Sequence, residues 1–516
     1  MDEKVSDSQT SNKRIVKNTL FLYFRMAIIM LVKLYTSRVL LEVLGVDDYG
    51  VWNVVAAFVV AFSFISSPLV TATQRFLNFD MGKGGHNLNA IFNISLELFF
   101  VIAVVVVIVL ETFGLWFVNH KMNFPPGSMD AVNWVFQFTI FTLFVNLLRM
   151  PYESTIIAYE RMSFYAIVSL VEAFLLLAIV FMLKIHFAVE SLIVYGALTF
   201  ISAILIFVYY QVYCSRRFEC VKLKLCWDKN YLKEIGTFSG WNLFGACSSM
   251  TATQGVNVLL NIFCGVAVNA AYGISMQINN AVSTVVYNLQ KASNPQIVKS
   301  YSSGDNERVQ DLVRNVGLYS FLLVVAFAVP MIFNMNYILH LWLGNNVPTY
   351  TSIFASFTLV QFSMMCFGGP MDTAVFATGK IKGYQVTLSI IIMLNVIFAY
   401  LVLALDMVPY WVMAVKCGVE GFILFARVVY MKKMIGLDIC SYIRKVFGPI
   451  SAILIIILAG MYGIDRLTAG CGGLEKLLKS TGLFIPIYIL SVWLFAFDST
   501  QRLKIKKMFK SKFMHG

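Results

Sequence analysis

Long apolar stretches, separated by short polar segments, recur along the chain from about Asn18 to Phe497. A helix that crosses the hydrocarbon core of a bilayer needs roughly 20 consecutive, mostly apolar residues. The pattern therefore predicts about fourteen membrane-spanning helices joined by short outer loops. The expected spans are residues 18–41, 51–73, 91–117, 131–151, 164–183, 188–212, 238–262, 270–289, 315–336, 351–376, 385–405, 409–430, 446–464 and 481–497.

Composition fits this pattern. Hydrophobic residues make up 59% of the 516 positions and charged residues only 13%, which is typical of an all-α polytopic membrane protein. The first apolar stretch has full membrane length and no small-residue cleavage site after it, so we expect no cleavable signal peptide. The nine Cys are scattered, mostly within apolar runs, which argues against a disulfide framework.

The distribution of basic residues predicts the orientation. An even number of spans places both termini on one side of the membrane, and most of the forty Lys and Arg fall on that side. The opposite side holds only Lys121, Lys184, Arg466, Lys476 and Lys479. Cytoplasmic loops carry an excess of Lys and Arg, so both termini are expected to be cytoplasmic. The net charge of +13 is accounted for in this way and does not call for a nucleic-acid partner.

A sequence motif occurs twice. Pro151-Tyr152-Glu153-Ser154, with Ala158 and Tyr165, returns 219 residues later as Pro370-Met371-Asp372-Thr373, with Ala377 and Tyr384. Six crossings return a chain to the same side, so the repeat predicts two parallel six-helix lobes related by a pseudo-twofold axis along the membrane normal, plus two C-terminal helices. The expected segments are an N-terminal cytoplasmic segment 1–17, lobes 18–212 and 238–434, a basic linker 213–237, the extra helices 435–497 and a basic tail 498–516.

The two prolines of the repeat, Pro151 and Pro370, fall at the cytoplasmic ends of the fourth and tenth expected spans. Proline removes a backbone donor and clashes with the preceding turn, so each is predicted to end its helix or to act as a hinge. Glu153 follows Arg149 by four residues, which favours an ion pair within one helix. The alternative is that Arg149 faces a central cavity.

The first expected span carries three charges, Arg25, Lys33 and Arg38. With about 1.5 Å of rise per residue, Arg25 and Lys33 lie within roughly 7 Å of the bilayer midplane. A basic side chain there costs about 2.5 to 3.5 kcal/mol, so these residues should face a wet or paired interior rather than lipid. They are the first candidates for an anion-binding face.

Other intramembrane polar residues are candidates as well. Spans seven and eight are rich in amides and hydroxyls, which either hold helices together or bind sugars. The amides singled out as sugar contacts are Asn242, Gln254, Asn257, Gln277 and Asn280. In the twelfth span Lys416, Glu420 and Arg427 share one face, where Lys416 and Glu420 either neutralise each other or line a cavity. Glu97, Glu172 and Glu420 are candidates for ion coupling, although each acid could equally be paired with a buried base.

Known catalytic and cofactor motifs are missing from the sequence. Gly82-Lys83-Gly84-Gly85 lacks the spacing of a phosphate-binding loop, so the chain is not by itself an ATP-driven pump. The five His form no metal-ligand pattern, and no nucleophile and base stand out. We expect a protein that is not an enzyme and has neither metal nor cofactor.

Several stretches resemble the Wzx-type oligosaccharide flippases of the multidrug/oligosaccharidyl-lipid/polysaccharide exporter superfamily. They are LLEVLGVDDYGVW at 40–52, TATQRFLNFDMGKG at 71–84, PYESTIIAYERMSFY at 151–165, FSGWNLFG at 238–245, NAAYGISMQINNAV at 269–282 and NPQI at 294–297. The resemblance implies a bacterial cytoplasmic (inner) membrane protein with two lobes around a cavity. It implies flipping of an undecaprenyl-pyrophosphate-linked oligosaccharide to the outer leaflet, for O-antigen, capsule or exopolysaccharide assembly alongside polymerase and assembly proteins.

The resemblance also implies that Arg25, Lys33 and Arg38 contact the pyrophosphate, because related flippases have basic residues on the first helix. What drives direction is open at this point, and a proton or sodium gradient acting on Glu97, Glu172 or Glu420 is a hypothesis. Three alternatives remain open at this point. They are a multidrug or small-cation exporter of the same superfamily, a membrane polysaccharide polymerase or ligase, and a non-transporting assembly scaffold.

Overall fold

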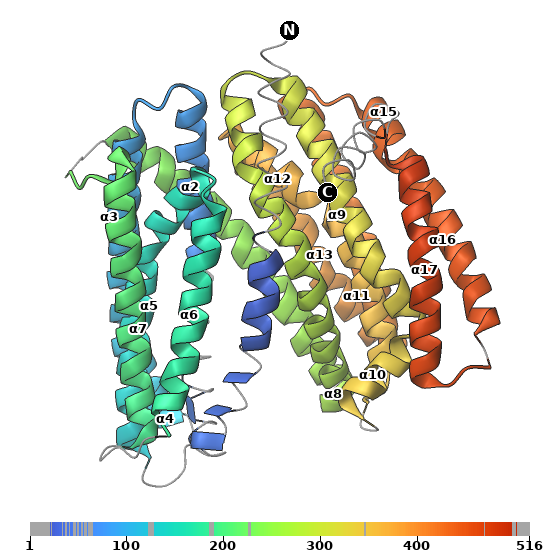
Figure 1. Cartoon of the computed structure of the whole chain (residues 1–516), viewed down its shortest axis with the longest axis horizontal. Helices are drawn as coiled ribbons and strands as arrows, with labels where there is room; N and C mark the ends of the chain where they lie inside the picture. Colours follow the sequence, from blue (N-terminus) through green and yellow to red (C-terminus); the bar gives the residue numbers. More distant parts are fainter. Residues whose placement is uncertain are drawn as a thin grey trace, which may run out of the picture. The chain divides into compact units, whose positions relative to one another are not determined.

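The structure is a computed structural model of the whole chain (Figure 1). It describes residues 21, 23–32, 35–36, 39–40, 42–44, 48, 51–52, 55, 59, 65–121, 128–184, 190–224, 229–344, 347–468, 470–497 and 502. These residues form helices and connecting turns, with no strand among them. They divide into two compact units, which are described separately: unit 1 comprises residues 1–246 and 298–304, and unit 2 comprises 247–297 and 305–516.

Unit 1 is built around α5, which packs against α2, α3 and α7. Phe92, Phe136 and Ile140 are fully buried in its core. A π-helical turn, η2, joins α3 to α4 within one continuous apolar helix, Leu88–His120. The bounds are α2 Ser66–Gly82, α3 Leu88–Val109, η2 Leu110–Gly114, α4 Leu115–Lys121, α5 Met129–Ala158, α6 Met162–Met182, α7 Ser191–Arg217 and η3 Glu219–Val221. The first expected span is represented by the short apolar helix Tyr23–Val32.

Unit 2 is organised around α14, which packs against α11, α12 and α13. The two helices beyond the repeat, α16 and α17, pack against each other and against α9. The bounds are α9 Asn306–Phe333, α10 Met335–Leu343, α11 Thr351–Met365, α12 Gly368–Ala377, α13 Lys382–Ala404, α14 Tyr410–Ile435, α15 Ile439–Tyr442, η4 Ile443–Phe447, α16 Gly448–Leu467 and α17 Gly473–Phe495. Helix α8, Lys229–Ser302, contributes residues to both units.

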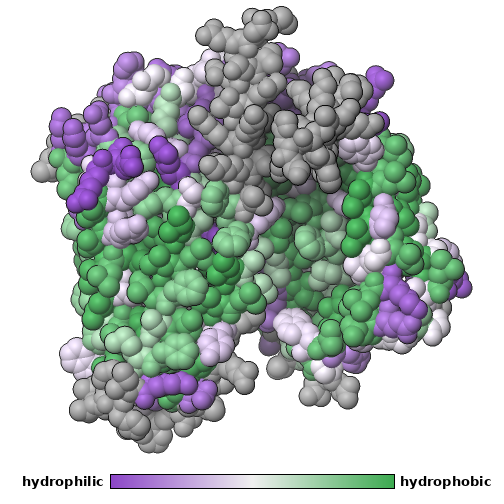
Figure 2. Space-filling view, viewed as in Figure 1, coloured by the Kyte–Doolittle hydropathy of each residue, from purple (hydrophilic) through white to green (hydrophobic). Residues whose placement is uncertain are grey.

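Within the described residues, nine helices are long and apolar enough to cross a membrane. Their outward faces carry large apolar side chains, and Figure 2 shows these covering the sides of unit 1 while hydrophilic residues gather toward the ends of its helices. A helix that satisfies its own backbone and presents apolar side chains outward is suited to lipid. The prediction of an all-α, multi-pass membrane protein is confirmed.

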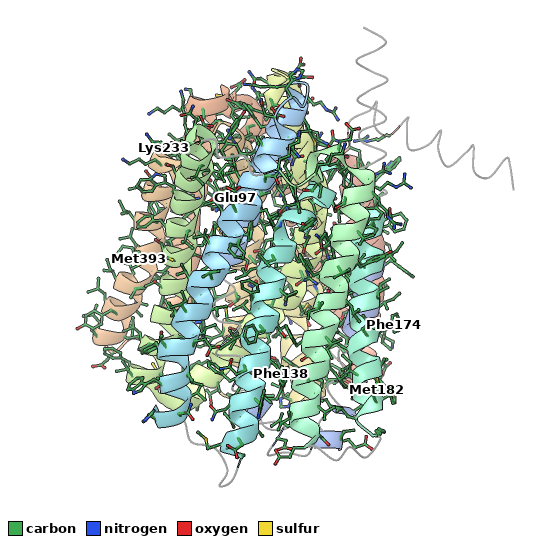
Figure 3. All side chains as sticks on the ribbon, turned by 90° about the vertical axis from the view of Figure 1, so that its left-hand side faces the viewer. Glu97, Phe138, Phe174, Met182, Lys233 and Met393 are labelled. Atoms are coloured by element: carbon green, nitrogen blue, oxygen red, sulfur yellow. The ribbon has the colours of Figure 1, made fainter. Side chains whose placement is uncertain are left out.

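Unit 1 also shows which residues share an end of the bundle. Figure 3 places Lys233 and Glu97 toward one end, and Met182 toward the other. The predicted topology assigns the Lys233 end to the cytoplasm and the Met182 end to the outer side. Glu97 therefore lies in the half of α3 nearer the basic end.

Two local expectations are confirmed and one was wrong. Spans seven and eight are separate helices that meet at a kink inside α8, at Gly265, with φ 78° and ψ −178°. That conformation is essentially restricted to glycine. The tenth span divides into α11 and α12 at residues 366–367, one turn before Pro370, as expected for a proline that interrupts its helix. Pro151, in contrast, does not end its helix, because α5 continues to Ala158.

Candidate functional site

A buried charge cluster lies in unit 2, centred on Arg427 of α14. Its Nε donates to Asp372 Oδ1 at 3.1 Å, and its Nη2 donates to Asp372 Oδ2 at 3.3 Å. Its Nη1 donates to Glu420 Oε1 at 3.5 Å. Tyr384 also donates its hydroxyl to Asp372 Oδ1. One guanidinium thus holds two carboxylates, in the planar geometry to which arginine is suited.

The guanidinium of Arg427 fits beside α12 because the first residue of that helix, Gly368, has no side chain. A Cβ built on Gly368 would lie 2.3 Å from Arg427 Nη1 and 2.5 Å from its Cζ. Any side chain at position 368 would therefore occupy the site of the guanidinium. The glycine is explained by the close approach of α14 to α12.

Lys416 lies away from this network, about three turns before Arg427 on α14. Its Nζ donates to the hydroxyl of the buried Tyr272 at 3.2 Å and lies 5.0 Å from the centre of that ring. The sequence favoured a pair between Lys416 and Glu420, and this expectation was wrong: Glu420 pairs with Arg427 instead. Lys416 is stabilised by a cation–π contact and a neutral hydrogen bond.

Lys416, Glu420 and Arg427 border a cavity of about 300 Å³ within unit 2. The rest of its polar lining consists of hydroxyls and amides from α8, α11 and α13. These are Ser249, Thr253, Asn279, Asn280, Thr358, Gln361 and Asn395. The side-chain oxygens Oδ1 of Asn279 and Asn395 are buried and have no hydrogen-bond partner in the described part of the chain. A buried acceptor without a donor costs free energy of folding. This side of the cavity is therefore suited to a ligand that carries hydroxyl or amide donors.

The break between α11 and α12 is held by a glutamine of α8. In a continuous helix the carbonyl of Cys366 would accept from residue 370, but Pro370 has no N–H. Gln290 Nε2 donates to that carbonyl at 2.8 Å and to Ser320 Oγ at 3.2 Å. A Cβ on Gly369 would lie 2.1 Å from Gln290 Oε1. A buried side chain thus replaces the missing backbone donor one turn before Pro370.

Unit 1 holds a partly buried arginine that forms an ion pair between helices. Arg149 of α5 donates from Nη1 to Glu172 Oε1 of α6 at 3.2 Å, and its guanidinium carbon lies 5.6 Å from the centre of the Tyr210 ring. Its side chain is 12% exposed. The sequence favoured a pair with Glu153 on the same helix; the ion pair observed is between helices, to Glu172. Glu172, a candidate coupling acid, is therefore joined to a base.

Arg25 is the one charge of the first span that falls among the described residues; Lys33 and Arg38 lie outside them. Its guanidinium carbon is 4.5 Å from the centre of the Tyr165 ring. Its Nε is buried and has no hydrogen-bond partner, and no carboxylate in the described part of unit 1 forms an ion pair with it. Arg25 is therefore held by an aromatic face and retains donor capacity.

Each copy of the repeat has an arginine beside it, supplied from a different position in the chain. Arg149 and Gly368 are 219 residues apart, as are Tyr165 and Tyr384. In unit 1 the motif supplies its own guanidinium from position 149. In unit 2 the equivalent position is a glycine, and Arg427 of α14 fills the space. A guanidinium beside the motif is thus common to both units.

The remaining predicted residues have varied settings. Asn280 lines the cavity of unit 2, whereas Gln254 and Asn257 bond to each other, Asn257 Nδ2 donating to Gln254 Oε1 at 3.4 Å. Gln277 is exposed. Asn242 belongs to unit 1 and donates to the carbonyl of Pro68 at 3.3 Å. Glu97 is half-buried on α3 and has no ion pair with any described residue.

Sequence reasoning missed three important residues of unit 2: Asp372, Tyr384 and Gln290. Asp372 and Tyr384 were visible in the repeated motif but were assigned to helix ending. The signal that could have revealed their role is Gly368-Gly369-Pro370-Met371-Asp372, since two glycines before a proline in a membrane helix leave room for a neighbouring side chain. No cluster of metal-binding side chains is found among the described residues.

Comparison with known proteins identifies the fold. The chain aligns over 83% of its length with 96% of an outward-facing multidrug resistance MATE family transporter of the MOP superfamily, at a TM-score of 0.71 and 12% identity. The chain has the MATE transporter fold. A MOP superfamily transporter from Pyrococcus furiosus, described by the reverse polarity of its binding pocket, matches over the same shares with a TM-score of 0.69 and 12% identity. MATE in complex with MaL6 matches at a TM-score of 0.67 and 14% identity, again over 83% and 96%.

No protein-family model matches the chain, and no curated protein matches it. The comparisons therefore establish the MATE fold and leave the cargo to be inferred from the side chains. Both the partly buried bases of unit 1, Arg25 and Arg149, and the polar cavity of unit 2 bear on that inference.

Proposed function

We propose that this protein is a membrane transporter that moves a polyprenyl-pyrophosphate-linked oligosaccharide from the cytoplasmic to the outer leaflet by alternating access. The observation that carries the proposal is Arg25, a guanidinium in an apolar helix that contacts the Tyr165 ring and has no carboxylate partner in the described part of unit 1. A base at that depth is costly unless it meets an anion. A pyrophosphate is an anion with the acceptor oxygens that a guanidinium binds well.

The sugar portion of the substrate is assigned to unit 2. Its cavity of about 300 Å³ is lined by hydroxyls and amides as well as by Lys416, Glu420 and Arg427. Two of its buried amide oxygens have no hydrogen-bond partner among the described residues. Sugar hydroxyls supply such donors and also accept from amide N–H groups. The polyprenyl tail would remain in lipid, since transfer of apolar chain into a polar cavity gains nothing.

The same geometry argues against export of a small organic cation through unit 2. The fold is shared with multidrug transporters, and a cation carrier would be expected to keep an acidic group free for its cargo. Here Asp372 and Glu420 are both held by Arg427. Export of a cationic dye that is abolished by Glu420→Gln would favour the multidrug alternative.

Ion coupling is part of the proposal. Of the three acids considered, Glu172 and Glu420 are held by arginines, while Glu97 has no ion pair with a described residue. Glu97 is accordingly the first candidate for a coupling proton or sodium ion. Flux that is insensitive to both gradients would exclude this part of the mechanism.

The test of the anion site is replacement of Arg25 by Gln, alone and together with Lys33→Gln, in a strain that depends on the protein. We expect lipid-linked glycan to accumulate in the cytoplasmic leaflet, with partial recovery in Arg25→Lys, because lysine keeps the charge and loses the fork geometry. Lys184→Gln is the matched control, since it removes one base beyond the end of α6. Normal export at full protein level in the Arg25→Gln/Lys33→Gln variant would contradict the proposal.

A further inference from the structure

A separate pocket, of about 540 Å³, lies in unit 1 where α3 begins and where the chain leaves α7. Its lining includes Arg217, Lys222 and Lys224, together with His86 and Tyr159. The transport mechanism proposed above does not use these residues. Their position and charge suggest a binding site of another kind.

The basic segment that follows α7 is fixed in place by two asparagines of α3. Asn89 Nδ2 donates to the carbonyls of Cys220 and Lys222 at 2.8 and 2.7 Å. Asn93 Nδ2 donates to the Lys222 carbonyl at 3.1 Å, and Asn93 Oδ1 accepts from the Lys224 N–H at 3.2 Å. The backbone of the segment is thus ordered without any help from a ligand, and its lysine side chains are left to solvent.

Cys220 is part of this anchoring and is not a reactive group. It is buried, and the Tyr159 hydroxyl donates to its Sγ at 3.7 Å. Burial raises the pKa of the Cys220 thiol. The thiol is therefore a neutral packing group beneath the pocket.

The pocket has an excess of positive charge. Arg217, Lys222 and Lys224 are exposed, and Glu219 is the single carboxylate of the lining. None of the three bases forms an ion pair with a residue that the structure describes. A concave surface with uncompensated bases attracts anions.

Aromatic pairs lie close to this pocket, as they do at the level of lipid headgroups. The rings of Phe164 and Tyr213 stack with centroids 3.5 Å apart, and those of Tyr159 and Phe218 lie 4.3 Å apart. Tyrosine-rich belts of this kind occur at membrane–water interfaces. Leu223, between the two lysines, is 63% exposed, as expected for a side chain that enters the acyl region.

We propose that this pocket binds the headgroup phosphate of an anionic phospholipid in the leaflet next to the basic end of unit 1. Arg217, Lys222 and Lys224 contact the phosphate, and Leu223 lies among the acyl chains. Basic pockets between helices on the cytoplasmic side are suited to anionic headgroups. The proposal is independent of the transported substrate.

The test uses the full-length protein, purified in detergent and examined by native mass spectrometry with added phosphatidylglycerol or phosphatidylcholine. We expect preferential retention of phosphatidylglycerol, and a roughly tenfold or greater loss of that preference in Arg217→Gln/Lys222→Gln/Lys224→Gln. Lys432→Gln/Lys433→Gln is the control, because it removes exposed bases from the last turn of α14 in unit 2. It should keep the preference.

The single variants Lys222→Gln and Lys224→Gln change exposed positions and should fold normally. Each should lose part of the preference for phosphatidylglycerol, which shows that the loss in the triple variant does not come from misfolding. Equal retention of the two lipids by the native protein would overturn the proposal. So would unchanged preference in the single and triple variants. Thermal stabilisation by inorganic phosphate that matches that by phosphatidylglycerol would also overturn it, since the site would then bind a free ion.

Discussion

At the scale of single residues, the Arg427 cluster shows how a membrane interior accommodates charge. The side chain of Arg427 is 10% exposed and that of Glu420 is 6% exposed. Removal of one partner from such a cluster leaves a buried charge without compensation and costs about 3 to 5 kcal/mol. The cluster is therefore sensitive to any change that moves the guanidinium, including changes at residues with no charge.

Gly368→Ala is predicted to destabilise the protein through Arg427. The new methyl would lie 2.3 Å from Nη1, so the guanidinium must leave its place between Asp372 and Glu420. Overpacking of this kind costs about 1 to 3 kcal/mol, which outweighs the gain of roughly 0.5 to 1 kcal/mol from replacing a helical glycine. The midpoint of thermal unfolding in detergent should fall.

Gly418→Ala on α14 provides the control for this prediction. No atom lies within 4 Å of a Cβ built there, so the helix gains alanine without a clash. Its unfolding midpoint should stay unchanged or rise slightly. Equal midpoints for the two variants would contradict the proposed close approach of α14 to α12.

At the scale of elements, the break between α11 and α12 depends on Gln290. Gln290→Ala should destabilise the protein by about 1 to 3 kcal/mol, because the buried carbonyl of Cys366 loses its donor. In a Pro370→Ala background residue 370 regains a backbone N–H, so Gln290→Ala should cost less there. The coupling is measured by thermal unfolding of the native protein, the two single variants and the double variant.

Gln277→Ala, at an exposed position of the same helix, should leave the unfolding midpoint unchanged. Additive effects of Gln290→Ala and Pro370→Ala would show that the amide does not substitute for the proline's missing donor. The double-mutant cycle thus separates this role from general packing.

The elements differ in how far the sequence could predict them. The fifth expected span, 164–183, corresponds to α6 at Met162–Met182, and the eleventh, 385–405, to α13 at Lys382–Ala404, because both are apolar and bounded by polar turns. The boundary between the seventh and eighth expected spans also agrees with the structure, since Gly265, the non-helical residue of α8, lies between them. The continuation of α5 past Pro151 to Ala158 was not predicted, because hydropathy does not encode backbone continuity.

For the candidate sites too, some features could be predicted from the sequence and others could not. The bases of the first span were identified because charge in an apolar run is visible in the sequence. The spacing of four residues wrongly suggested Lys416 with Glu420, whereas Arg427 holds Glu420 and Asp372. It also suggested Arg149 with Glu153, and the structure shows an ion pair from Arg149 to Glu172 on the neighbouring helix. Spacing along one helix is local information, and these contacts depend on the packing of two helices.

At the scale of the whole molecule, the predicted orientation distinguishes the two ends of α16. Cys440 is exposed just before it, among Lys432, Lys433, Arg444 and Lys445, whose charges favour the cytoplasm. Beyond its other end lies Cys471. Two of the three bases there are paired with carboxylates: Lys476 Nζ lies 2.7 Å from Asp465 Oδ1, and Lys479 Nζ lies 2.5 Å from Glu475 Oε1. Arg466, the third, donates to the hydroxyl of Tyr462. This end therefore carries fewer uncompensated bases than the end with Cys440, which favours its location on the outer side.

A membrane-impermeant maleimide applied to intact cells should therefore label Cys471 and spare Cys440. The measurement uses two variants that each keep one of these cysteines and carry alanine at the other Cys positions. After permeabilisation both should be labelled, which controls for access to the thiols. Labelling of Cys440 alone in intact cells would invert the orientation. The pocket with Arg217, Lys222 and Lys224 would then face the outer leaflet, and the direction of the proposed lipid-linked transport would be reversed.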